Sequence, residues 1–246
     1  MIKSYELVIK SNKKINYTPY NMGHWFYAEL LSKYECSFSD YIHTLEVSPI
    51  NQYIYTEGEN LIWHINALGD MAVYETDKFL FSLKDIYIKN IDVDFAVLGM
   101  RTKSINDIMS LIDQSDENKK LSRIHFKTPA AYKQNGEYIN MPSIEYSLKG
   151  LINKWNRLFP ETQIEDEDGE GVKTIIQGIK ICDFNIYSTH FRFKQAIIPS
   201  FIGEITIKNN LKGVHKQLGD ALIEFSEYAG IGIKTSLGMG GVKVRR

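Results

Sequence analysis

The C-terminal segment "YAGIGIKTSLGMGGVKVRR" gathers residue types that can bring a backbone close to a phosphate. Glycine has no Cβ, so backbone N–H groups can approach an anion, while Lys234 adds positive charge and Thr235 and Ser236 add hydroxyl donors. Two common nucleotide motifs do not fit. Ile233 separates the lysine from the preceding glycine, unlike in a P-loop, and Thr235 stands where a dinucleotide fingerprint needs its third glycine.

Two roles remain for the glycines of this segment, which are Gly230, Gly232, Gly238, Gly240 and Gly241. In the first, the loop contacts a nucleic-acid backbone. In the second, the glycines let the last strand pack closely against a helix, and both roles are compatible with each other.

Histidine is well suited to proton transfer near neutral pH, because its ordinary pKa is roughly 6.5. Among the six histidines, His43 lies between the helix-like "SFSDYI" and the "SP" that opens a strand, a position that can face a cleft between domains. His24, near the start of the first helix, competes with it. His64, in the strand-like "IWHIN", is expected to pack. A lone histidine is more often structural than catalytic, so the residues alone leave the choice open.

Composition indicates a globular protein of one or two domains, with 246 residues, 43% hydrophobic content and a net charge of −1. This near-zero net charge hides an uneven distribution of charged residues along the chain. Residues 161–170 carry six carboxylates, most simply a solvated acidic loop, whereas residues 172–246 hold eleven Lys and Arg against five Asp and Glu. The first residues lack the apolar core and cleavage site typical of a signal peptide, and no apolar run is long enough to span a membrane, so we expect a cytoplasmic protein. Cys36 and Cys182 form no metal or disulfide pattern and are expected to be buried.

The order of predicted elements in the first half is β-α-β-β-α-β, the ferredoxin-like unit. Alternation, helical spacing and a hairpin signal around "EGEN" indicate these elements, in order at residues 4–10, 19–34, 48–66, 67–83 and 85–99.

The second half repeats this order. Strands are predicted at residues 122–133, 172–194, 198–209 and 240–244, with helices at 143–159, capped by Ser143, and 211–230, ended by Gly230. The fold class is therefore α+β, with two tandem ferredoxin-like domains, at 1–116 and 117–246, and a C-terminal glycine-rich loop.

Three stretches resemble the Cas6 family of CRISPR-associated, repeat-cleaving endoribonucleases. The C-terminal loop is similar to the family's G-x-G-x-K-T-x-x-G-x-G signature. "IHFKTPAAYKQNGEYINMPSIEYSLKGLINKWNRLF" resembles its "F-x-T-P" strand, proline link and helix, and "DYIHTLEVSPINQYIY" resembles its histidine, "S-P" and strand. The resemblance runs from about Tyr41 to Val244 and implies tandem ferredoxin-like domains, CRISPR repeat RNA as partner, and a ribonuclease that needs no metal or other cofactor.

The resemblance also implies which residues form the site. His43 matches the catalytic histidine, and Tyr27 is the candidate for a tyrosine that many members supply from the first helix, with Tyr34 and Tyr41 as alternatives. Many members carry a lysine shortly after the histidine, but "TLEVSPINQYIY" has no Lys or Arg. Lys234 or another basic residue supplies the charge here, or substrate positioning replaces it.

Further candidate RNA contacts come from basic residues outside the C-terminal loop. Arg192 and Lys194 alternate with phenylalanines in "HFRFK", which predicts both charges on one strand face, and Lys127 precedes "TP". A solvated strand face explains them equally well. With the loop residues, the RNA-binding candidates are Gly232, Lys234, Thr235, Ser236, Gly238, Gly240, Lys127, Arg192 and Lys194.

We expect the protein to be a monomer or a homodimer, with subunits of a CRISPR effector complex as further possible partners. A second function class is a non-catalytic RNA-binding subunit of such a complex, which would not need His43. A third, suggested by fold class alone, is a ferredoxin-like enzyme of small-molecule metabolism, but it leaves the lysine- and glycine-rich loop unexplained.

Overall fold

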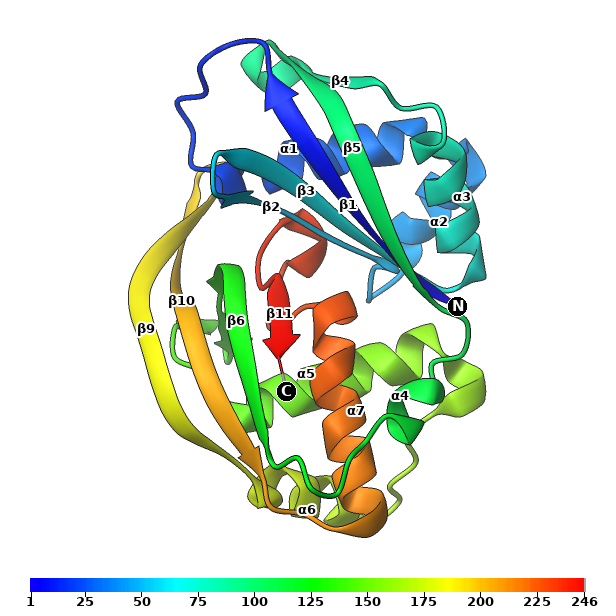
Figure 1. Cartoon of the computed structure of the whole chain (residues 1–246), viewed down its shortest axis with the longest axis vertical. Coiled ribbons are helices and arrows are strands. Elements are labelled where there is room, and N and C mark those ends of the chain that lie inside the picture. Colours follow the sequence, from blue (N-terminus) through cyan, green and yellow to red (C-terminus); the bar gives the residue numbers. More distant parts are fainter. Residues whose placement is uncertain (246) are drawn as a thin grey trace.

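The computed structural model describes residues 1–245 and shows two antiparallel sheets, each covered on one face by helices (Figure 1). The N-terminal half forms the upper part of Figure 1 and the C-terminal half the lower part, and the C-terminal loop, drawn in red, lies where the two halves meet. Across the described residues no helix is long and apolar enough to cross a membrane.

The first sheet has the strand order β2-β3-β1-β5-β4. Its first four strands follow the ferredoxin-like pattern, in which the first and third strands of the unit, here β1 and β3, are central neighbours, and β4 extends the edge. The strands are β1 (Ile2–Ser11), β2 (Ile50–Glu57), β3 (Asn60–Leu68), β4 (Asp85–Ile88) and β5 (Val93–Ile105). The helices of this half are η1 (Pro19–Met22), α1 (Gly23–Lys33), α2 (Cys36–Thr44), α3 (Asp70–Leu80) and η2 (Lys89–Ile91).

The second sheet has the strand order β11-β6-β10-β9, which is the same ferredoxin-like pattern. Its strands are β6 (Leu121–Ala130), β9 (Ile179–Phe193), β10 (Ala196–Asn209) and β11 (Val242–Arg245), and β7 (Tyr132–Gln134) pairs separately with β8 (Glu137–Ile139). The helices are α5 (Ile144–Leu158), η3 (Pro160–Thr162), α6 (Glu170–Gly178), α7 (Gly213–Ala229) and η4 (Thr235–Leu237). The predicted fold class is confirmed.

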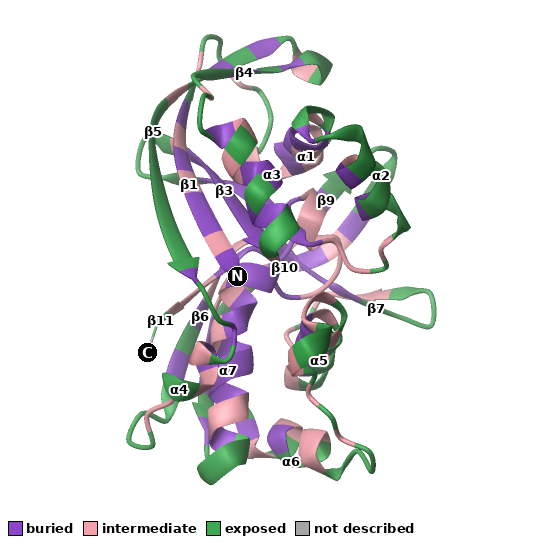
Figure 2. Ribbon diagram, turned by 90° about the vertical axis from the view of Figure 1, so that its right-hand side faces the viewer, coloured by how far each residue is buried: buried purple, intermediate pink, exposed green. Residues whose placement is uncertain are grey.

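Two of the predicted helix ends have the expected local chemistry. The Ser143 hydroxyl accepts a hydrogen bond from the Tyr146 amide at the start of α5, and Gly230 ends α7 with a φ of 69°. Figure 2 shows that α7 is largely buried; it packs in the core of the C-terminal half, and its last residues reach the first sheet.

Three local predictions are wrong. Residues 172–178, assigned to a strand, belong to α6, because Val172, Ile175 and Ile176 are spaced for a helix and Ile175 packs into the core. Cys36 and Cys182 are exposed, since they lie on the outer side of α2 and β9.

The seam between the halves is a short helix, α4 (Ser110–Asp113). Leu111 of α4 and Ile105 at the end of β5 join the hydrophobic core of the C-terminal half, together with Ile2 and Leu68. The two cores therefore meet along the lower edge of the first sheet, and a domain boundary after residue 116 stays a prediction.

Candidate active site

The glycine-rich loop between α7 and β11 is tied to the end of β6. The Ile233 amide donates to the Ala131 carbonyl (3.0 Å), and the Gly240 amide donates to the Pro129 carbonyl (2.8 Å). Within the loop, the Ile231 amide donates to the Gly240 carbonyl (2.9 Å). These bonds connect the two stretches that carry the family resemblance in the C-terminal half, "KTPAA" and the loop.

The glycines of this loop are required by packing within the protein. A Cβ on Gly232 would collide with the Ala131 carbonyl and one on Gly240 with the Ile231 carbonyl, and both residues have positive φ, 89° and 61°. Gly238, with a φ of 107°, lies against the backbone of Gly23 at the start of α1. Their backbone contacts with RNA stay a prediction.

Gln52 of β2 connects this loop to the first helix. Its carboxamide nitrogen donates to the Gly23 carbonyl (2.8 Å) and to the Ser236 carbonyl (2.7 Å), while its oxygen accepts from the Trp63 indole (2.9 Å). Gln52 is 0% exposed, so these bonds form away from solvent. The carboxamide therefore sets the position of η4 relative to α1.

The carbonyls at the C-terminal end of α7 are also capped from other elements. Asn66 and Asn51, from the first sheet, donate to the Glu227 and Tyr228 carbonyls (2.9 Å each). The ammonium of Lys154, from α5, donates to the next two carbonyls, at residues 229 and 230 (2.7 and 3.0 Å), and to the Thr235 hydroxyl (3.2 Å). A cation at this end of a helix interacts favourably with its dipole, although burial lowers the pKa of Lys154 to about 7.

His43 and Tyr27 lie beside this loop. His43 is exposed on the last turn of α2, as predicted from its place before "SP". Tyr27, half-buried on α1, has its hydroxyl 3.1 Å from the Ser48 hydroxyl. Burial raises the pKa of Tyr27, while hydrogen bonds with Ser48 and Ser236 act in the opposite direction.

The two alternative tyrosines are placed differently. Tyr34 is buried in the core with its hydroxyl 2.7 Å from that of Thr76, and Tyr41 is 54% exposed on α2. Tyr41 lines a different cavity, whereas Tyr27 lines one with His43 and the C-terminal loop.

Two cavities meet at His43 and Tyr27. The first, of about 580 Å³, is called the loop cavity here, because the C-terminal loop forms one wall; it is also lined by Ser48 and Lys154. The second, of about 910 Å³, is called the aromatic cavity and lies between α1 and the tip of the β9–β10 hairpin. His43, Tyr27 and Leu237 line both, so the two cavities form one groove with His43 at their junction.

Lys234 stands where the loop faces this groove. It is a non-glycine residue with a φ of 54°, a conformation that costs energy and persists only where the surroundings hold it. The amides of Leu237 and Met239 donate to its carbonyl (2.9 and 3.3 Å). Its ammonium lies 4.7 Å from the centre of the Phe193 ring, and it makes no ion pair with the residues the structure describes.

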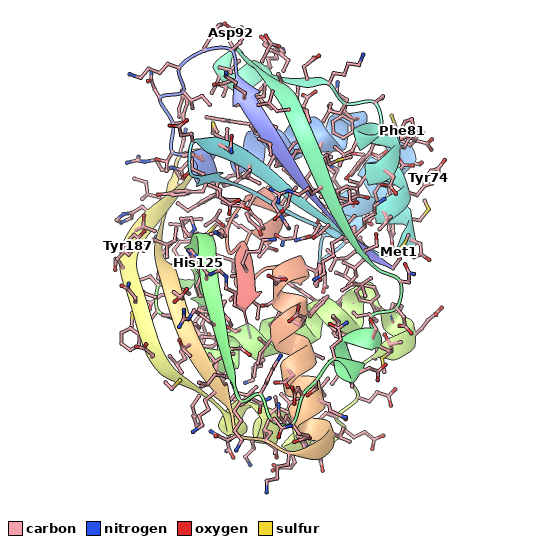
Figure 3. The ribbon with its side chains drawn as sticks, viewed as in Figure 1. Met1, Tyr74, Phe81, Asp92, His125 and Tyr187 are labelled. Carbon is pink, nitrogen blue, oxygen red and sulfur yellow. The ribbon has the colours of Figure 1, made fainter. Side chains whose placement is uncertain are left out.

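The remaining candidate cations divide between the groove and the outer surface. Arg192 and Lys194 line the aromatic cavity, although they do not share a strand face, because β9 ends at Phe193 and Lys194 occupies the hairpin turn with a φ of 53°. Lys127 lies 5.1 Å from the centre of the Tyr55 ring in a separate cavity, on the flank where Figure 3 labels His125 and Tyr187.

The other two histidines considered above take different places. His64 is buried and stacked on Tyr53 (ring centroids 4.7 Å apart), as predicted. His24 lines the aromatic cavity, where burial, with a contribution from Lys194, lowers its pKa.

The sequence did not indicate Gln52, Gly23 or Lys154. A Cβ on Gly23 would lie 2.6 Å from the Leu237 carbonyl, so α1 can approach the loop only through a glycine. Gln52 lies in the first six residues of β2, which are all buried. A buried polar side chain needs hydrogen-bond partners, so its presence there is the signal in the sequence that could have indicated a long-range contact.

Comparison with known proteins agrees with this arrangement. Residues 124–242 match the model of the CRISPR-associated endoribonuclease Cas6 family. The chain is 27% identical to a Cas6 of Streptococcus thermophilus, over 94% of this chain and 95% of that protein. It is 24% identical to a Cas6 of Mycobacterium tuberculosis, over 91% and 72% respectively. A Thermus thermophilus Cas6 product complex superposes with a TM-score of 0.81 over the full length of both chains at 17% identity.

The fold is therefore the tandem ferredoxin-like fold of these proteins, with a groove where the two units meet. The resemblance noted in the sequence is confirmed, and the chain is a homologue of the CRISPR-associated Cas6 endoribonucleases.

We predict that Gln52→Ala destabilises the protein and loosens the loop. The substitution leaves the Trp63 indole and two carbonyls without their partner, and each buried unsatisfied group costs about 1–3 kcal/mol. Thermal melting should shift down by several degrees, by roughly 2–4 °C per kcal/mol in a chain of this size. Hydrogen exchange at residues 231–241 should accelerate, while exposed Gln195→Ala serves as the control. An unchanged melting temperature and unchanged hydrogen exchange in Gln52→Ala would show that Gln52 does not hold the loop in place.

Proposed function

We propose that this protein is an endoribonuclease that cleaves CRISPR repeat transcripts into guide RNAs by attack of the RNA's own 2′-hydroxyl. The observation that carries the proposal is the junction of two cavities at His43, an exposed histidine that shares their walls with Tyr27 and the Lys234-bearing loop. The names of its homologues, which are CRISPR-associated endoribonucleases, support the same activity.

The chemistry needs three contributions from the protein. A base removes the proton of the 2′-hydroxyl, an acid protonates the departing 5′-oxygen, and a cation or hydrogen-bond donor stabilises charge on the phosphate. The 2′-oxygen attacks phosphorus as the bond to the 5′-oxygen breaks, so the products carry a 2′,3′-cyclic phosphate and a 5′-hydroxyl. Neither step requires a metal ion in principle.

The groove offers a residue for each contribution. His43, exposed at the cavity junction, is placed to exchange protons with RNA from solvent. The Tyr27 hydroxyl, positioned by Ser48, can donate a hydrogen bond to a phosphate oxygen, and its raised pKa keeps it protonated. Lys234 takes the place of the lysine missing after His43, since the Lys154 ammonium already bonds three oxygens of α7 and the loop.

The alternative function, a non-catalytic RNA-binding subunit, gives His43 no task. An exposed histidine whose side chain forms no hydrogen bond or ion pair with the described residues, and which lines a groove with Tyr27, favours catalysis. The proposed activity also places the protein in the cytoplasm, where repeat transcripts are made, working as a monomer or homodimer alone or beside effector subunits.

We expect His43→Ala to lower single-turnover cleavage of a repeat RNA by about 10²–10⁴-fold, the usual contribution of general acid–base catalysis, with RNA affinity nearly unchanged. His215→Ala, an exposed histidine on α7, is the matched control and should cut at the wild-type rate. If His43→Ala cuts normally and His24→Ala does not, the catalytic histidine has been assigned to the wrong residue.

We expect cleavage to continue in excess EDTA and to stop when the nucleotide before the cut has a 2′-deoxy sugar, because the nucleophile is then missing. Product ends mapped by sequencing and mass spectrometry should show a cyclic phosphate and a 5′-hydroxyl. Magnesium-dependent cutting of the deoxy substrate is incompatible with the mechanism.

We expect Lys234→Ala to weaken RNA binding and to reduce its dependence on salt. Loss of one phosphate contact should lower the slope of log K against log salt by roughly 0.7–0.9. Lys149→Ala, which removes an exposed lysine paired with Glu145 on α5, is the control and should leave the slope unchanged. If Lys234→Ala leaves the RNA affinity and the salt slope unchanged, Lys234 does not contact the RNA.

A further inference from the structure

The aromatic cavity has no task in the cleavage chemistry above, although it is the larger of the two cavities that meet at His43. Its volume of about 910 Å³ is at the upper end of the range typical for small-molecule sites. Because it shares Tyr27, His43 and Leu237 with the loop cavity, an RNA strand with its scissile phosphate at His43 has this cavity on one side.

Aromatic rings from three segments form its walls. Tyr17, from the linker after β1, is 50% exposed and packs edge-on against Trp25 of α1, with ring centroids 5.1 Å apart. His24 lies 4.8 Å from Trp25 and 5.4 Å from Phe193 of the β9–β10 hairpin. Flat, partly exposed aromatic surfaces of this kind are the platforms on which unpaired nucleobases stack.

The charge of the cavity is entirely positive. Arg192 and Lys194 line it, no Asp or Glu does, and neither cation forms an ion pair with any residue in the range 1–245. The Lys194 ammonium lies 5.5 Å from the centre of the Phe193 ring, and Lys234 lies on the same ring at 4.7 Å. These cations have no acidic partners and lie beside aromatic walls, so the cavity suits a ligand that carries both a phosphate and a base. A cationic ligand would be repelled, and a purely apolar ligand would leave the cations without a partner.

The polar edge of the cavity can distinguish a base. Burial lowers the pKa of His24, which favours the neutral imidazole; its Nδ1 atom is buried, so Nε2 is the ring nitrogen left for a ligand, as a donor or an acceptor according to the tautomer. Asn21 also lines the cavity, and its side-chain oxygen accepts from the Arg192 amide (2.9 Å), which holds the hairpin tip against η1 and leaves the Asn21 NH2 group as a possible donor. Donor and acceptor groups beside stacking surfaces are how single-stranded bases are bound.

We propose that the aromatic cavity binds one unpaired nucleotide adjacent to the scissile phosphate, with its base against Tyr17 and Trp25 and its phosphate against Arg192 and Lys194. This inference rests on the proposed function and adds to it a requirement on the substrate. The RNA must be single-stranded, or must release one base from its stack, at that nucleotide. The cavity would thereby fix the position of the cut relative to any paired stem.

The test is an abasic scan of the repeat RNA. The cut is first mapped with wild-type protein, and cleavage is then blocked by a 2′-deoxy sugar before it. Each nucleotide within three of the cut is replaced in turn by an abasic one, and the dissociation constant is measured. We expect one position to lose affinity by about 10-fold, because stacking of one base contributes roughly 1–3 kcal/mol.

The second part pairs that RNA with protein variants. Tyr17→Ala and Trp25→Ala should each weaken binding of the intact RNA several-fold but have little further effect on the abasic RNA. Tyr74→Ala is the control: Tyr74 is 60% exposed on α3, on the opposite flank of the upper half from the β9–β10 hairpin (Figure 3). Since Trp25 also packs against the core, the exposed Tyr17→Ala and Lys194→Ala keep the test valid if Trp25→Ala does not fold.

The outcomes separate the two proposals. If wild-type protein neither binds nor cuts the repeat RNA, the proposed function itself fails. Two other outcomes would overturn only the present inference, in a protein that both binds and cuts the RNA. In the first, no abasic substitution weakens binding. In the second, the losses of affinity from Tyr17→Ala and from the abasic site add independently, so the aromatic cavity is not the site of that nucleotide.

Discussion

The buried carboxamide of Gln52 is the contact on which the geometry of the groove depends. It joins the start of α1, 29 residues before it, to η4, whose Ser236 lies 184 residues after it, and it does so with two donors and one acceptor used at once. Glutamate could only accept when ionised, and an apolar side chain would leave the Trp63 indole unpaired. Because α1 carries Tyr27 and η4 follows Lys234, neither half of the protein can build the site alone.

The same dependence extends to the end of α7. A helix ends with carbonyls that have no partner within the helix, and here those carbonyls are bonded by Asn51 and Asn66 of the first sheet and by Lys154 of α5. The end of α7 thereby acts as the joint between the two ferredoxin-like units. The loop that follows starts from a fixed point, so the positive φ of Lys234 is imposed by bonds on both sides of it.

Local structure was largely predictable from the sequence, and long-range contacts were not. Alternation, helical spacing and the Ser143 cap are local signals, and they placed most strands and helices in the right order. The segment at 172–178 failed because "VKTIIQG" fits both periods over so short a length, and only the packing of Ile175 decides between them. His43 and Tyr27 became candidates through the family resemblance, whereas the roles of Gln52 and Gly23 depend on their contacts with the distant C-terminal loop. Nothing near them in the sequence encodes their partners.

The glycines of the C-terminal loop show how packing and function share the same residues. Their Cβ atoms are excluded by Ala131, Ile231 and Gly23, all within the protein, so a glycine-rich signature is explained without any ligand. Yet the close approach that they permit is what brings Lys234 and Ser236 to the wall of a groove that His43 also lines. A substitution at Gly238 therefore cannot separate stability from RNA binding, whereas one at Lys234 can, since its side chain projects from a backbone that the glycines and Gln52 already hold. In the proposed function, recognition by this loop would depend on a rigid backbone that presents a few side chains, and contacts between the two halves supply that rigidity.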